Sequence, residues 1–138
     1  AGILDQLRLA GLPAEPEYHL TIRDVPLEEQ GRERLRQLMK LPEPPTAIIC
    51  IHDAIAANAI DELRKLGKLV PRDVSVFGFD DSFMARTLLL SSVRQPFTEV
   101  GKRAVRLLYE KRFGGDSVRH QEFLPCRIVN RKSVAELV

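Results

Sequence analysis

The sequence has 138 residues, of which 44% are hydrophobic and 29% charged, which is typical of one soluble domain with its own core. The 21 basic and 19 acidic residues nearly cancel, and a net charge of +2 is too small by itself to predict binding to nucleic acid or membranes. No run approaches the ~18 apolar residues of a membrane-spanning helix, and the first residues lack a signal-peptide pattern. Because the sequence begins without methionine and directly in a helical pattern, we expect a fragment of a longer chain.

The first part of the chain alternates between helical and strand-like patterns. Apolar residues at helical spacing predict a first helix that ends near Ala10, because the following Gly11–Pro13 cannot continue it. Residues 17–22 are predicted to form a short strand. A second helix is predicted within residues 24–41, with a proline and two glutamates in its first turn.

The middle of the chain has the pattern of strands joined by helices. Residues 46–51 form a nearly continuous apolar run, which predicts a strand covered by helices on both faces. A helix follows, with Asp53 as its candidate cap and Gly67 as its end, and residues 74–79 form the next strand. The order of strand, helix, strand, helix, strand predicts an α/β fold with a parallel, helix-covered sheet.

The last part of the chain no longer alternates regularly between strand and helix patterns. Residues 88–97 are predicted to be extended, and apolar residues at helical spacing predict a helix over 97–113. Residues 122–131 are predicted to form a final strand, which Pro125 should interrupt, so an edge or bent strand is expected. The spacing of Cys50 and Cys126 matches no metal or redox motif, so buried free thiols in a reducing compartment are expected.

Polar side chains follow the predicted strands. Because the carboxyl ends of parallel strands gather at one edge of a sheet, these side chains are the candidates for a binding site. They are Arg23, Asp24, His52, Asp53, Asp80, Asp81, Arg94 and Gln95. Their mixture of donors and acceptors suits a small polar ligand with several hydroxyl groups. Asp53 is better explained as a helix cap and Asp81 as a turn or cap residue, whereas Asp80, His52 and Arg94 fit a ligand or a structural role equally well.

Enzyme motifs are absent from the sequence. It contains no dinucleotide-binding or phosphate-binding glycine pattern, no zinc-protease motif and no nucleophile elbow. Asp80 and Asp81 are adjacent at a strand end, so they should point to opposite sides and not share one proton. The basic residues of the helix over 97–113 are expected to form a solvated face. We therefore expect no catalytic residues, cofactor or metal.

Two stretches of the sequence resemble a known family. They are "PTAIICIHDAIAANAIDELRKLGKLVPRDVSVFGFDDSF" at 45–83 and "LLLSSVRQPFTEVGKRAVRLLYEKRFGG" at 88–115. Both resemble the C-terminal half of the effector-binding core of LacI/GalR-type transcriptional regulators, which is similar in fold to type I periplasmic sugar-binding proteins. The most specific segments are "VPRDVSVFGFDD" and "SSVRQPFTEVGKRAV".

The resemblance implies a function and a site. Such regulators are repressors with two α/β lobes, a small effector between them and an N-terminal helix-turn-helix domain that binds operator DNA. Asp80 matches the residue that binds effector hydroxyls, and Gln95 matches a polar residue that reaches the same cleft. His52 stands where the family usually has asparagine. With Arg94 from the same edge of the sheet, these residues are the predicted effector site, and a sugar is the leading effector class.

The resemblance also implies partners. Residues 1–138 would be the C-terminal lobe, the helix over 97–113 would pack on the missing first lobe, and the DNA-binding domain would precede residue 1. A cytoplasmic homodimer is expected, and a periplasmic sugar-binding protein of a transport system is the alternative. Candidates for the dimer interface, with ordinary core packing left open, are Ala56, Asn58, Ala59, Leu88, Leu89 and Leu90.

Overall fold

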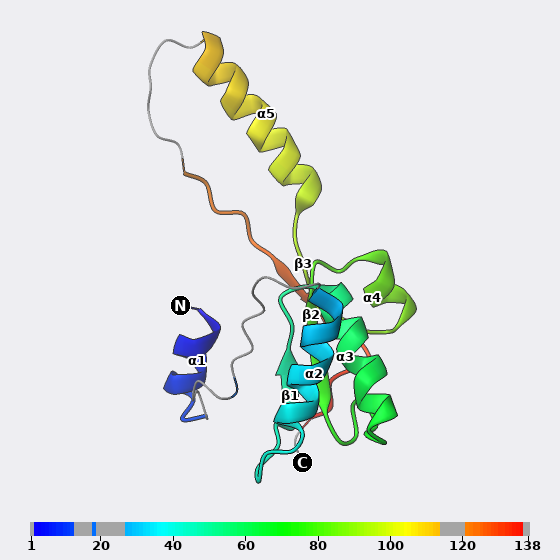
Figure 1. The fold of residues 1–138 in the computed structure, drawn as a ribbon. Helices are drawn as coiled ribbons and strands as arrows, with labels where there is room; N and C mark the ends of the chain where they lie inside the picture. The colour runs from blue at the N-terminus through cyan, green and yellow to red at the C-terminus, as the bar shows by residue number, and fades with distance from the viewer. Residues whose placement is uncertain (1, 13–17, 19–26, 114–120, 137–138) are drawn as a thin grey trace.

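The computed structural model describes residues 2–12, 18, 27–113 and 121–136 (Figure 1). Its helices are α1 (Ile3–Leu9), α2 (Leu27–Leu38), α3 (Asp53–Lys65), α4 (Phe83–Thr87) and α5 (Phe97–Phe113). Its strands are β1 (Ala47–Ile49), β2 (Ser75–Phe79), β3 (Ser91–Arg94) and β4 (Arg127–Val129). The predicted strand at 17–22, together with Arg23 and Asp24, falls almost entirely outside the described residues.

One four-stranded sheet organises the described residues, with strand order β1-β2-β3-β4. β1, β2 and β3 are parallel, as predicted, whereas β4 pairs antiparallel with β3 at the edge of the sheet. The edge position of the last strand is confirmed, and Pro125 lies before it, where no ladder hydrogen bond is needed. The fold class is therefore α/β with a mixed, mostly parallel sheet.

The core lies between the sheet and α3, and α2 packs on α3 (Figure 1). Val76 of β2 is fully buried against the same cluster as Ala56 and Leu63 of α3. On β1 the expectation of two covered faces is wrong for the described residues, because Ile49 is 52% exposed. Ile49 is exposed because the described helices cover only one face of β1.

Helix α5 projects away from the sheet and does not fold back on it (Figure 1). Its apolar residues Phe97, Val100 and Leu108 are exposed, although their spacing places them on one face of the helix, as in a helix that packs on a partner. Helix α1 likewise has no buried residue. No described helix is both long and apolar enough to span a membrane.

The structure adds a short helix that the sequence analysis missed. The predicted extended segment at 88–97 begins with the end of α4, whose C-cap is Leu88, and β3 starts only at Ser91. Ser82 caps α4 by accepting a hydrogen bond from the backbone N–H of Ala85. Five residues are too few for a periodic pattern, so only this cap could have indicated the helix.

Candidate functional site

Three parallel strands end at the same edge of the sheet, and a polar side chain follows each one. Asp80 comes directly after β2 and Gln95 directly after β3, while His52 lies between β1 and α3. His52 occupies the N-cap position of α3 in an extended conformation. The strand ends therefore bring residues from three parts of the sequence to one place, as the rule for parallel sheets predicts.

These three side chains form one hydrogen-bonded group, which we call the rim cluster (His52, Asp80 and Gln95). The Gln95 side-chain amide donates to Asp80 Oδ1 over 2.7 Å, and His52 Nδ1 lies 3.0 Å from Asp80 Oδ2. The Asp80 side chain is 27% exposed and that of His52 is 57% exposed. The cluster is thus ordered by its own contacts and still open to a ligand.

The backbone at the tip of β2 has an unusual conformation. Asp80 has φ 109° and Asp81 has φ 52°, so both non-glycine residues are in the left-handed half of the conformational map. Such residues cost roughly 1–3 kcal/mol each, although aspartate tolerates the region better than most. The backbone N–H groups of the two residues donate to Val93 O and to Ser92 Oγ. Contacts with β3 therefore maintain a strained backbone next to the candidate site.

Asp81 points away from the rim cluster, as predicted for adjacent residues on a strand end. Its side chain is completely buried, and it accepts hydrogen bonds from Arg94 Nε and from Arg131 Nη2, each with a donor–acceptor distance of 2.5 Å. Burial alone would raise the pKa of the Asp81 carboxyl, but the hydrogen bonds from the two arginines outweigh it, so this pKa lies below its usual value. Asp81 is the centre of a buried ion-pair network, a larger role than the predicted turn residue.

Asp53 is a structural residue, but it is not the predicted helix cap. The N-cap of α3 is His52, and the Asp53 side chain extends from the first turn into the core. Its carboxylate accepts hydrogen bonds from Ser92 Oγ over 2.6 Å and from the backbone N–H of Ser82 over 2.7 Å. It thereby connects α3, β3 and the start of α4 beneath the rim cluster.

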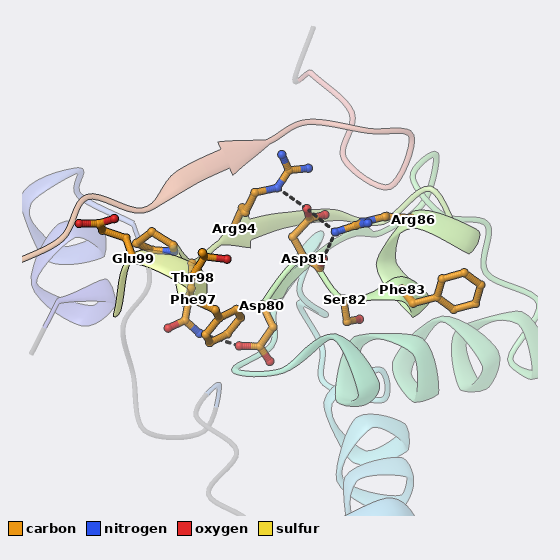
Figure 2. Close-up of a pocket in the computed structure, with 11 residues that line it drawn as sticks. Asp80, Asp81, Ser82, Phe83, Arg86, Arg94, Phe97, Thr98 and Glu99 are labelled. Atoms are coloured by element: carbon orange, nitrogen blue, oxygen red, sulfur yellow. Dashed lines mark hydrogen bonds and ion pairs between the residues drawn. The ribbon is translucent and has the colours of Figure 1, made fainter. Parts of the chain in front are cut away.

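Arg94 bonds to Asp81 and not to the rim cluster, but it lines the same cleft as Asp80 and Gln95. Figure 2 shows Arg94 directed to Asp81, on the other side of the chain from the Asp80 carboxylate. Its side chain is 51% exposed and borders an open cleft of about 580 Å³. The cleft is lined by residues 80–83 and 94–99 together with Arg86.

Three of the six dimer candidates are core residues. Ala56, Ala59 and Leu90 are buried in the chain's own hydrophobic cluster, so they have no surface to offer a partner. Leu88 and Leu89 are exposed. The side-chain oxygen of Asn58, the remaining candidate, accepts a hydrogen bond from Arg32 within the chain.

The apolar surface around Leu88 and Leu89 extends along α4. Phe83 is 83% exposed and Met84 is 44% exposed. Sequence reasoning missed both residues because it did not predict the helix that presents them.

A second buried ion-pair network joins α2 to α3. Glu62 is 2% exposed, and its carboxylate accepts hydrogen bonds from Arg36 Nε and Arg32 Nη1. The hydrogen bond from Arg36 is the main cause of a pKa of Glu62 below its usual value.

No group of three or more potential metal ligands occurs among the residues that the structure describes.

Comparison with known proteins identifies the family. The family described as "Periplasmic binding protein-like domain" matches residues 1–134. The HTH-type transcriptional repressor CytR of Escherichia coli K12 is 30% identical over 138 residues, which are 99% of this chain and 40% of that protein.

Solved structures of regulators have the same fold. A LacI transcriptional regulator from Bacillus cereus subsp. cytotoxis superposes with a TM-score of 0.89 at 29% identity, over 100% of this chain and 49% of that one. The transcriptional regulator CelR in complex with cellobiose gives a TM-score of 0.80 at 27% identity, over 94% of this chain and 39% of that one. The chain spans two fifths to one half of the length of these proteins. The chain belongs to the periplasmic binding protein-like domain family, and its resemblance to the effector-binding domains of LacI/GalR-type regulators is confirmed.

Proposed function

We propose that the chain is the C-terminal lobe of the effector-binding region of a transcriptional repressor, and that it senses a small polar ligand without a catalytic step. The observation that carries this proposal is the rim cluster, because it joins three parallel strand ends in a fold whose ligands bind at that edge. The regulators found in the comparisons support the regulatory role. They also weigh against the alternative of a periplasmic transport protein, which has a similar lobe.

The geometry of Asp80 favours a ligand with adjacent hydroxyl groups. An ionised carboxylate can accept about four hydrogen bonds, and His52 and Gln95 occupy one position on each oxygen. The remaining positions can accept from two hydroxyls of one sugar, as in a vicinal diol. The complex of CelR with cellobiose is consistent with this ligand class. A sugar is therefore the leading effector class.

The regulatory mechanism follows from a ligand that contacts two lobes. An effector that binds one lobe orientation more tightly shifts the equilibrium towards it, and an attached helix-turn-helix domain then changes its affinity for operator DNA. The first lobe would cover the exposed apolar face of α5, which the chain itself leaves uncovered. Leu88, Leu89 and α4 would contribute to a homodimer in the cytoplasm.

The test uses the complete regulator that contains this chain. A thermal-shift screen of monosaccharides, cellobiose and other disaccharides, and nucleosides identifies ligands that stabilise the folded protein. Fluorescence anisotropy then measures operator affinity with and without the best ligand. The proposal expects a sugar among the stabilising ligands and a change in operator affinity of about 5- to 150-fold, the range typical of allosteric coupling. Ligand binding without any change in operator affinity would contradict the regulatory part of the proposal.

A further inference from the structure

We propose that the buried carboxylate of Asp81 is a positioning group for its neighbour Asp80. Its ion pairs with Arg94 and Arg131 fix the backbone of both aspartates so that Asp80 faces the rim cluster. The inference rests on the proposed function for the role of Asp80 in ligand binding. The contacts around Asp81 can nevertheless be tested without any ligand.

The ion pairs of Asp81 hold its side chain in one orientation. Arg131 donates from Nη2 to Asp81 Oδ1 and from Nη1 to the backbone carbonyl of Leu90 over 2.7 Å, and its own side chain is only 13% exposed. Arg94 Nε donates to the other carboxylate oxygen. A guanidinium that binds two fixed acceptors at once determines direction as well as distance. We call this group the Asp81 clamp (Asp81, Arg94 and Arg131).

The backbone conformation explains why Asp80 needs such a clamp. Both aspartates have positive φ, a conformation that persists in a non-glycine residue only when its surroundings enforce it. On the core side, Ser92 Oγ accepts a hydrogen bond from the backbone N–H of Asp81 and donates one to the buried carboxylate of Asp53. The clamp fixes the other end of the same residue. If it is released, the peptide between the aspartates can rotate and turn Asp80 away from His52.

Arg94 also connects the Asp81 clamp to the segment that leaves the sheet towards α5. Arg94 is the last residue of β3, which continues into α5, and Arg131 follows β4, which the chain enters from residues 121–126. Figure 1 shows both segments leaving the sheet at the same end. A movement of the segment that leads to α5 would therefore reach Asp80 through Arg94 and Asp81.

The hydrogen bond between His52 and Asp80 supplies a direct readout. An ionised carboxylate can only accept, so the His52 ring must carry its proton on Nδ1 to make this contact. Long-range ¹H–¹⁵N spectra of the complete regulator distinguish the two tautomers at a pH of about 8.5, where an unperturbed imidazole is neutral. The His52 signals are assigned by their absence from a His52→Asn variant. We expect an Nδ1–H signal in the wild type and its loss in Asp81→Asn and Arg131→Lys.

A matched control separates positioning from general destabilisation. Like Asp81, Glu62 is a buried carboxylate that accepts hydrogen bonds from two arginines, but it lies between α2 and α3. Glu62→Gln should destabilise the protein and leave the Nδ1–H signal of His52 unchanged. If Asp81→Asn does not fold, Arg94→Gln is the milder variant, because Arg94 is half exposed and the pair between Asp81 and Arg131 remains.

The outcomes are distinct from those of the proposed function. A folded Asp81→Asn or Arg94→Gln variant that retains the wild-type His52 tautomer overturns the positioning role, whatever the protein binds. Loss of the signal in Glu62→Gln as well would also overturn it, because the effect would then be a general one. A protein that shows the expected tautomer changes but binds no sugar contradicts the proposed ligand class and leaves the positioning role intact.

Discussion

Replacement of Gly78 by alanine should destabilise the chain, although it adds a single methyl group. Gly78 lies in β2 beneath the rim cluster, and a Cβ atom there would be 2.9 Å from Leu90 Cδ2 and still closer to Asp53 Oδ1. Neither neighbour can move freely, because Leu90 is fully buried and Asp53 accepts hydrogen bonds from Ser82 and Ser92.

The magnitude follows from three contributions. Overpacking of a dense core costs typically about 1–3 kcal/mol, and alanine recovers about 0.5–1 kcal/mol relative to glycine in a strand. Displacement of the Asp53 carboxylate would also remove a hydrogen bond to a charged group, which contributes about 1.5–3 kcal/mol. The expected loss in the free energy of unfolding is therefore about 2–5 kcal/mol.

Urea unfolding of the 138-residue chain, followed by circular dichroism, measures this loss as a lower midpoint with an unchanged slope. Gly101→Ala is the matched control, because a Cβ atom added at this position of α5 would have nothing within 4 Å. That variant should keep or slightly increase the free energy of unfolding, since alanine favours a helix. A Gly78→Ala protein as stable as the wild type would refute the close approach of Asp53 to β2.

Three further predictions concern other parts of the chain. Because the pKa of Asp81 is lower in the folded chain than its usual value, its stabilising effect is present above about pH 4 and is lost as the pH falls through the folded pKa. Acid titration of the unfolding free energy should therefore be less steep in Asp81→Asn than in the wild type. Burial raises the pKa of the Cys50 thiol to about 12, whereas Cys126 is exposed, so the expectation of a buried thiol is wrong for Cys126. A thiol reagent at pH 8 should therefore label Cys126 quickly and Cys50 only after unfolding, and equal rates would contradict the fold around β1. The isolated chain should self-associate through the exposed apolar face of α5, and Leu108→Lys should weaken this association in sedimentation velocity; a wild-type monomer would contradict it.

Much of the candidate site could be predicted because it follows from topology. Once residues 46–51 and 74–79 are assigned to parallel strands, their carboxyl ends must lie at one edge, which places His52 near Asp80. Gln95 required the further assumption that the segment before it is a parallel strand, which is confirmed. The opposite directions of Asp80 and Asp81 were predicted from the alternation of side chains along a strand. In the structure both residues follow β2 and have positive φ, so the turn after the strand sets these directions.

The roles of buried polar residues could not be predicted in the same way. Asp53 and Asp81 look like cap or turn residues from their local sequence, but their partners Ser92 and Arg131 are 39 and 50 residues away. Rules based on neighbouring residues favoured a helix cap at Asp53, but in the structure His52 occupies the N-cap position of α3. The apolar spacing of α5 likewise predicted a packed face, and it cannot reveal that no described residue of this chain covers that face.

The central claim is that Asp80 binds the effector, and isothermal titration of the complete regulator tests it most directly. The ligand is the best one from the thermal-shift screen, with cellobiose as the first candidate. Removal of a charged hydrogen-bond partner in Asp80→Asn should cost about 1.5–3 kcal/mol, or roughly 10- to 150-fold in Kd. The Glu62→Gln control should bind as the wild type does. An Asp80→Asn regulator that binds this ligand within about twofold of the wild-type affinity, a difference of about 0.4 kcal/mol, would contradict the account.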